Sequence, residues 1–166
     1  DLWYTNAMTH TKETVKGFTL VEILIVVAII AMLASVALVG LGPVQRNGRD
    51  TRRISDLRQV QNGVELYFAK CGYYPGGAQA DTTCTGFSGI SDWSSLSGAL
   101  TGSSIGISKI PVEPRAGASY SYGSTDGYTY VLGATLENEG ASSLRDDIDG
   151  VVEGVDCDDP VYCVQL

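Results

Sequence analysis

Residues 18–42 read FTLVEILIVVAIIAMLASVALVGLG, and this stretch decides how the chain is organised. No charged side chain occurs in the 19 residues from Ile23 to Leu41. A helix that crosses a membrane needs about 20 apolar residues, whereas the apolar part of a cleavable secretory signal is shorter, at about 7–15 residues. A buried core helix is the other alternative, but a run that is apolar on every side needs a larger protein around it. We therefore predict a membrane-spanning helix at residues 18–43.

The segment before this helix is polar and reads DLWYTNAMTHTKETVKG. It begins with Asp1, so both Asp1 and Met8 are candidate starts of the natural chain. Within the apolar stretch, Glu22 is a single carboxylate in a place where a charge is costly. Glu22 therefore either reaches the lipid headgroups without a further role or has a function of its own.

After the apolar stretch, residues 44–71 continue as an amphipathic helix. Leu57, Val60 and Val64, followed by Tyr67 and Phe68, recur at the three- and four-residue spacing of one helix face. Gly40, Gly42 and Pro43 interrupt the pattern between the two halves. Proline removes a backbone donor and glycine weakens the turns before it, so we expect a kink or a melted turn there.

Residues 72–166 have a different composition, because they contain 15 of the 20 glycines. In chain order we expect a loop at 72–89, a short helix at 92–100 capped by Asp92, strands at 119–122 and 128–136, and a last strand at 161–166. This zone is small for an independent core, so we expect the amphipathic half-helix to pack on its sheet. The predicted fold class is therefore α+β, with a long N-terminal helix packed on a small antiparallel sheet.

The chain contains four cysteines, an even number that suits two disulfides in an oxidising compartment. Four cysteines allow three pairings. We predict the sequential pairing, Cys71–Cys84 and Cys157–Cys163, because each bond closes a glycine-rich segment that has little core of its own.

The composition argues against catalysis and against nucleic acid as a general partner. The net charge is −8, and the single histidine, His10, precedes the apolar stretch. We find no glycine-rich phosphate loop and no C-x-x-C pair, and the Ser94-Ser95 and Ser103-Ser104 pairs are typical of loops. We therefore predict that the protein is not an enzyme.

Two further patterns allow more than one interpretation. The arginines of residues 46–58 can contact anionic headgroups or DNA, but we favour a solvated helix face that pairs with acids of neighbouring subunits. The tyrosines after residue 119 can stack on nucleic acid or sugar, but their strand spacing favours packing between strands. These tyrosines are Tyr120, Tyr122, Tyr128 and Tyr130.

The junction Gly17-Phe18-Thr19-Leu20-Val21-Glu22, followed by the apolar helix, resembles the type III signal of type IV pilins and pseudopilins. Residues 52–61 and the later Tyr73-Tyr74-Pro75 look similar to major pseudopilins. The likeness covers residues 16–75 and weakens beyond about residue 115.

This resemblance implies that a prepilin peptidase removes residues 1–17 by cutting between Gly17 and Phe18, and that the new amine of Phe18 is methylated. It also implies that Glu22 pairs with the Phe18 ammonium of a neighbouring subunit, since two buried charges become tolerable as a pair. The implied domains are a leader, the helix at 18–43 and a head at 44–166. A count of basic residues on the two sides of the helix favours a cytoplasmic head, but the family places the head outside, as the cysteines also suggest.

The C-terminal zone is strongly acidic, with ten carboxylates and one arginine between residues 120 and 166. Asp147-x-Asp149-Gly150 offers two carboxylates and a turn, although it falls short of an EF-hand. The resemblance to major pseudopilins implies a calcium site near Asp146-Asp147-Ile148. We expect Asp146, Asp147 and Asp149 as ligands, with Glu137, Asn138 and the Leu136 carbonyl as lesser candidates. The alternative is a solvated acidic loop.

Three functions follow from these patterns. The first is a structural subunit of a helical, homo-oligomeric type IV pilus-like filament, anchored in the inner membrane as a precursor and assembled there by dedicated machinery into an extracellular fibre. The second is a major pseudopilin of a type II secretion system in the periplasm or cell envelope. The third, of another class, is a membrane-anchored extracellular binding module. Nucleic acid is an expected partner only if the filament takes up DNA.

Overall fold

The computed structural model describes residues 17–76, residue 84 and residues 92–166, and gives only the backbone for residues 37–40. The leader up to residue 16 and most of the loop expected at 72–89 lie outside the described residues. The chain divides into a first unit that ends at Leu41 and a second unit, Gly42–Leu166, which we call the head. We describe the two units separately.

The longest element is the helix α1, which runs from Leu20 to Cys71. It ends where Gly72 adopts a φ of 79°, a left-handed conformation that glycine accepts without strain, and the Gly72 N–H donates to the Phe68 carbonyl at 2.7 Å. Pro43 lies inside this helix, and the backbone stays helical from Gly40 to Pro43. The melted turn that we considered is therefore not present in the isolated chain.

The described residues contain no single helix that meets the length and hydropathy expected of a membrane span. The stretches Leu20–Val36 and Leu41–Cys71 meet those criteria together, as a bent pair.

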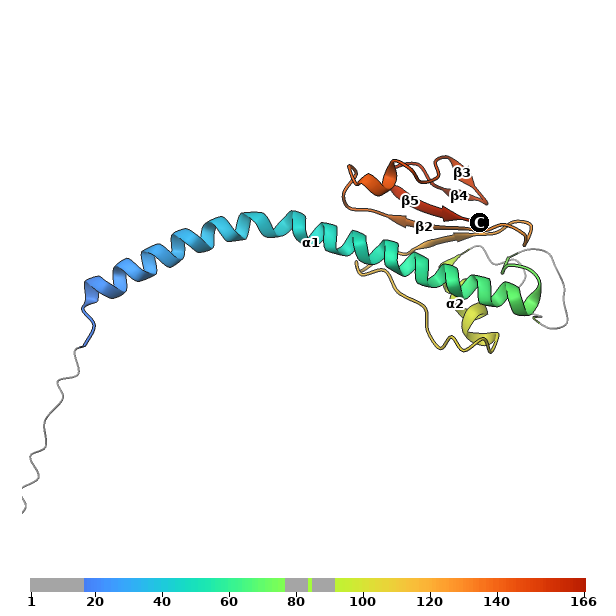
Figure 1. The fold of residues 1–166 in the computed structure, drawn as a ribbon, viewed down its shortest axis with the longest axis horizontal. Coiled ribbons are helices and arrows are strands. Elements are labelled where there is room, and N and C mark those ends of the chain that lie inside the picture. Colours follow the sequence, from blue (N-terminus) through green and yellow to red (C-terminus); the bar gives the residue numbers. More distant parts are fainter. Residues whose placement is uncertain (1–16, 77–83, 85–91) are drawn as a thin grey trace, which may run out of the picture. The chain divides into compact units, whose positions relative to one another are not determined.

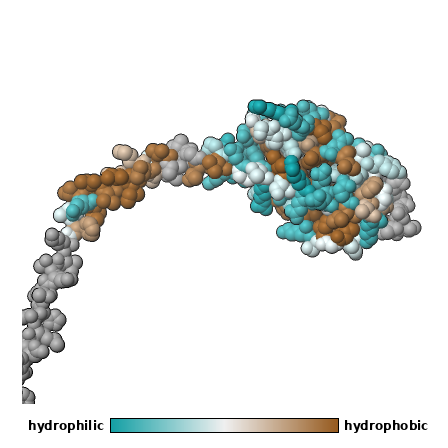
Figure 2. Space-filling model, in the orientation of Figure 1, coloured by the Kyte–Doolittle hydropathy of each residue, from teal (hydrophilic) through white to brown (hydrophobic). Residues whose placement is uncertain are grey.

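In the first unit, the described side chains from Gly17 to Val36 are all exposed. Phe18 is 83% exposed and Leu20 is 79% exposed, although both are large apolar residues. Figure 2 shows this stretch as a nearly continuous hydrophobic surface, whereas the head is mainly hydrophilic with scattered apolar patches. The described part of the first unit therefore contains no core of its own.

The head contains an antiparallel sheet of three strands in the order β1-β2-β5. The strands are β1 (Ser121–Gly123), β2 (Val131–Thr135) and β5 (Val161–Gln165). They confirm the three expected strands: β2 and β5 are shorter than expected, and β1 is shifted towards the C-terminus. The short helix η1 (Ser142–Leu144) and the small hairpin of β3 (Val151–Val152) and β4 (Val155–Asp156) were not predicted, because segments of two or three residues show no recognisable period.

The head core forms between the second half of α1 and the sheet, which lies along one side of that helix in Figure 1. Leu57, Val60 and Val64 of α1 are at most 2% exposed, and they pack in one cluster with Tyr122 and Leu132 of the sheet. This is the amphipathic face that the sequence predicts. The expected α+β architecture is therefore present.

The short helix α2 (Trp93–Gly102) closes the other side of α1. Its N-cap is Asp92, as predicted, and the carboxylate accepts the N–H groups of Ser94 and Ser95 at 2.9 and 3.0 Å. Three of the four tyrosines after residue 119 are buried, as expected if they pack within the head: these are Tyr120, Tyr122 and Tyr130. Tyr128 is 59% exposed.

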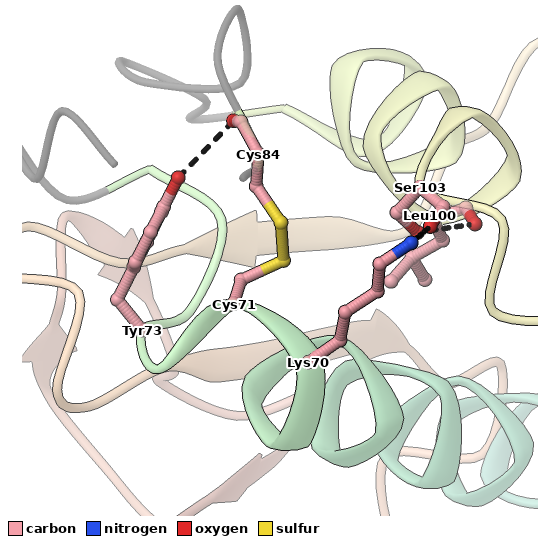
Figure 3. Close-up of a disulfide and its surroundings, with 6 residues drawn as sticks. All are labelled: Lys70, Cys71, Tyr73, Cys84, Leu100 and Ser103. Carbon is pink, nitrogen blue, oxygen red and sulfur yellow. Dashed lines mark hydrogen bonds between the residues drawn. A yellow bond between two sulfur atoms is a disulfide. The ribbon is translucent and has the colours of Figure 1, made fainter. Parts of the chain in front are cut away.

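Two disulfides link segments of the head. Cys71 at the end of α1 is bonded to Cys84, and Cys157 is bonded to Cys163 of β5. Figure 3 shows the first bond: the Tyr73 hydroxyl donates to the Cys84 carbonyl at 3.1 Å, and the ammonium of Lys70 donates to the Ser103 carbonyl after α2. The structure thus contains the sequential pairing.

Candidate functional site

The beginning of α1 is built around Thr19 and Glu22. The Thr19 N–H and hydroxyl both donate to Oε2 of Glu22, at 2.8 and 2.7 Å, and the Glu22 N–H donates back to the Thr19 hydroxyl at 3.2 Å. This is a capping box, in which a threonine and a glutamate three residues later satisfy each other's backbone donors. The functional candidate Glu22 therefore also starts its own helix.

The capping box leaves the second oxygen of Glu22 available. Among the described residues, no hydrogen bond engages Oε1 of Glu22, and the residue is exposed. That oxygen can accept a bond from a cationic group of another chain. The role of Thr19 was not predicted, although the T-x-x-E spacing of residues 19–22 was a signal for it.

The expected cleavage point lies just before the helix. Gly17 and Phe18 are exposed and non-helical, and α1 begins only at Leu20. A protease binds its substrate in an extended form, so a helical junction would first have to unwind. The geometry of this junction suits cleavage between Gly17 and Phe18.

A second candidate site is a cluster of three carboxylates in the head. Oxygen atoms of Asp147, Asp149 and Asp159 lie within 4.8 Å of one another. Backbone contacts bring the two loops together, since the Cys157 N–H donates to the Gly150 carbonyl at 2.9 Å. Asp159 was not among the expected ligands, because it is distant in sequence from the other two.

The surroundings of Asp147 suit a bound cation. Its Oδ2 accepts the Cys163 N–H at 2.9 Å, whereas its buried Oδ1 has no hydrogen-bond partner among the described residues. Burial raises the pKa of Asp147, and the charges of Asp149 and Asp159 raise it further. Three carboxylates with an unsatisfied buried oxygen fit the oxygen ligands that calcium prefers.

The other expected ligands are used differently. Glu137 accepts hydrogen bonds from Arg49 at 2.6 and 2.5 Å, and the Asn138 N–H donates to Asp50 at 3.0 Å. The Leu136 N–H donates to the Pro160 carbonyl at 2.8 Å, and its side chain lies in the head core. Neither Glu137 nor Asp146 belongs to the cluster of Asp147, Asp149 and Asp159, so of the expected carboxylate ligands the structure brings together Asp147 and Asp149.

Part of the arginine cluster on α1 is buried, which corrects the expected solvated helix face. Arg53 is 1% exposed and pairs with Asp50 at 2.6 Å, Glu113 at 2.5 Å and Glu137 at 3.0 Å. These acids come from α1, from the turn near Pro114 and from the segment after β2. Arg53 therefore fixes three segments of the head to one another.

One sequence pattern was overlooked. Residues 102–106 read GSSIG and match the G-x-S-x-G pattern of serine hydrolases, whose central serine lies in a sharp turn from a strand to a helix. Here Ser104 instead follows the end of α2, with a φ of 54°. The described residues include no histidine that could act as its base. The surroundings of Ser104 therefore do not support a nucleophile.

Comparison with protein families identifies the N-terminal motif. Residues 14–38 match the prokaryotic N-terminal methylation motif, which is the class III signal-peptide motif of type IV pilins and pseudopilins. No curated protein and no solved structure matches the chain. The motif implies processing by a prepilin peptidase, a membrane-anchored precursor and assembly into a pilus-like filament.

Proposed function

We propose that this chain, which carries the class III signal-peptide motif, is the structural subunit of a helical type IV pilus-like surface filament. The observation that supports the proposal most directly is the exposure of the whole described stretch from Phe18 to Val36, which is almost entirely apolar. Burying this surface is favourable by roughly 25 cal/mol per Å² of apolar area. A bilayer buries it before assembly, and the helices of other subunits bury it in the filament.

Assembly then depends on Glu22. Cleavage after Gly17 creates an ammonium group on Phe18, and the Oε1 atom of a neighbour's Glu22 is able to accept a hydrogen bond from this group. Each charge is costly alone in an apolar environment, and the pair is tolerable. Because the capping box fixes the Glu22 side chain on its helix, the pair also fixes the axial step between successive subunits.

The runner-up is a major pseudopilin of a type II secretion system. It is favoured by the likeness of residues 52–61 to that class and by the carboxylate cluster next to Asp146-Asp147-Ile148. The third proposal is a different class of function, a membrane-anchored extracellular binding module. It requires neither cleavage after Gly17 nor pairing by Glu22.

Immunoelectron microscopy of the native cell surface, with an antibody against the head, separates these functions. A pilus subunit gives long labelled fibres at the natural expression level. A pseudopilin gives a cleaved subunit in the envelope and no long fibres. An uncleaved chain confined to the membrane contradicts both filament functions and supports the binding module.

We further propose that Asp147, Asp149 and Asp159 hold calcium in the head. The three carboxylates repel one another, and a divalent cation removes that repulsion and satisfies the buried Oδ1 of Asp147. The ion would tie the loop after η1 to the residue that precedes Pro160 and β5.

Thermal unfolding of the detergent-solubilised full chain, with calcium and with a chelator, tests this site. A ligand that binds only the folded state at 100 times its Kd stabilises it by about 2.7 kcal/mol, so the midpoint must rise with calcium concentration. Asp159→Asn should abolish the rise, while the matched control Asp146→Asn should keep it. An unchanged wild-type midpoint at millimolar calcium would remove the site from this account.

A further inference from the structure

A cleft of about 830 Å³ opens in the head beside the buried Arg53. One wall is α1, which contributes Arg46, Arg49 and Arg53. The opposite wall consists of the turn at residues 113–115 and the segment at residues 135–139. All of these residues belong to the head.

Two arginines of the cleft have no acidic partner among the described residues. Arg49 and Arg53 are neutralised within the head by Glu137, Glu113 and Asp50, whereas Arg46 and Arg115 are exposed and form no ion pair there. Of the acids in the same lining, Glu139 is the one that forms no ion pair with a described residue. The unpaired charges of the cleft are therefore net positive.

The head also presents exposed acids without basic partners among the described residues, and these acids are not part of the cleft lining. Asp146, Asp156 and Asp158 are exposed, and none forms an ion pair with a described residue. Asp146 and Asp158 are the chain neighbours of Asp147 and Asp159, whose carboxylates approach within 4.8 Å, so they lie at one corner of the head. We call Asp146, Asp156 and Asp158 the acidic corner.

The acidic corner retains accepting capacity after its local hydrogen bonds. The Asp158 N–H donates to Oδ1 of Asp156 at 3.1 Å, and the Gly150 N–H donates to Oδ1 of Asp158 at 3.0 Å. These bonds hold the two carboxylates in place and leave their Oδ2 atoms without a hydrogen-bond partner among the described residues. The acidic corner shares no residue with the cluster of Asp147, Asp149 and Asp159. A cation bound to that cluster therefore leaves the acidic corner available.

We propose that Arg46 and Arg115 of one subunit bind the acidic corner of a second copy of this chain. One guanidinium comes from α1 and the other from the turn after Pro114, so a carboxylate that enters the cleft is bound from two sides, by charge-assisted hydrogen bonds. The contact joins two different patches, which makes it heterologous, and such contacts extend into open helical assemblies. The inference rests on the proposed function, because a filament supplies the second copy.

Zero-length cross-linking of purified filaments tests this contact. The variant Arg46→Lys with Arg115→Lys keeps both positive charges and adds primary amines, which a carbodiimide joins to nearby carboxylates as amides. The matched control is Arg58→Lys, at an exposed position of α1 outside the cleft. Trypsin releases residues 146–166 as one peptide, so mass spectrometry of the covalent dimer can locate the link.

The expected result is a covalent dimer in which a substituted cleft position is joined to Asp146, Asp156 or Asp158, and no such link in the control. Intact filaments without this link overturn the inference and leave the proposed function standing. If the wild-type chain forms no filaments, the proposed function fails and this inference fails with it.

A second set of variants covers the case in which the lysine variant does not assemble. Arg46→Glu with Arg115→Glu should lower the filament yield at least about tenfold, since a contact of about 1.4 kcal/mol is worth that factor. Adding Asp156→Lys and Asp158→Lys should restore the yield. Unchanged assembly of the first variant, or no restoration in the second, contradicts the contact.

Discussion

Glu22 caps its own helix, and we propose that the same carboxylate pairs with a neighbouring subunit. Its Oε2 atom accepts from Thr19, whereas no described residue forms a hydrogen bond with its Oε1 atom. An uncharged isostere can keep much of the cap geometry but cannot pair with an ammonium group. The two roles can therefore be separated by substitution.

We expect Glu22→Gln to leave cleavage between Gly17 and Phe18 intact and to lower the filament yield at least about tenfold, the factor that corresponds to 1.4 kcal/mol. The subunit mass reports cleavage, and sedimented fibres report assembly. Thr19→Ser, which keeps the hydroxyl of the cap, is the control and should assemble normally. A normal yield for Glu22→Gln would show that its charge has no part in assembly.

The charge of Glu137 makes the stability of the head depend on pH. Hydrogen bonds from Arg49, together with those from Arg53, lower the pKa of Glu137 from 4.5 to about 2. A carboxyl with a lowered pKa in the folded state stabilises the fold above its unfolded pKa, and this contribution disappears as the pH falls through the folded pKa. The stabilisation by Glu137 is thus complete above about pH 5 and is lost towards pH 2.

Thermal midpoints of the wild type and of Glu137→Gln, measured between pH 7 and pH 2, test this dependence. The variant should melt at a lower temperature near neutral pH, and the difference should vanish as the pH approaches 2. A difference that stays constant over this range would mean that the ion pairs of Glu137 contribute nothing.

At the scale of elements, the packing of β1 against the small hairpin depends on a missing side chain. A Cβ atom on Gly123 would lie 2.3 Å from the Glu153 carbonyl oxygen and 2.9 Å from a methyl group of Val155. Gly98 in α2 has no such neighbour within 4 Å. The same substitution should therefore have opposite effects at the two positions.

We expect Gly123→Ala to destabilise the head by about 1–3 kcal/mol through overpacking. Gly98→Ala should stabilise it by up to about 1 kcal/mol, because alanine favours a helix interior. Urea unfolding of both variants gives the two free energies. Equal effects of the two substitutions would mean that the close approach of the hairpin to β1 is not rigid.

Pro43 carries a prediction for α1 in the filament. Its ring removes one helical hydrogen bond and clashes with the preceding turn, at a cost of about 3 kcal/mol or more, and Gly40 and Gly42 weaken the same turns. We expect residues 40–43 to lose helical hydrogen bonds once neighbouring helices pack around them. A filament map with unbroken helix through these residues would contradict this prediction.

The elements that the sequence predicts are those specified by local signals. The spacing of Leu57, Val60 and Val64 predicted the buried face of α1, and Asp92 marked the start of α2. The Arg53 network was not predictable in this way, because Arg53 and Glu113 are 60 positions apart and only the fold brings them together. The same holds for Asp159, which joins the carboxylate cluster through the closure of two loops.

In the molecule as a whole, the two units differ in how they treat their apolar side chains. The head, Gly42–Leu166, closes its own core and neutralises its buried arginine with three acids. The first unit leaves its apolar side chains exposed and carries the N-terminal methylation motif. We infer that a chain with this division needs a membrane or other copies of itself to bury its helix.

Mass spectrometry of the subunit released from native filaments tests this requirement. We expect the subunit in the fibre to begin with N-methylated Phe18 and to lack residues 1–17. A peptide that spans the intact Gly17–Phe18 bond in assembled fibres would contradict it.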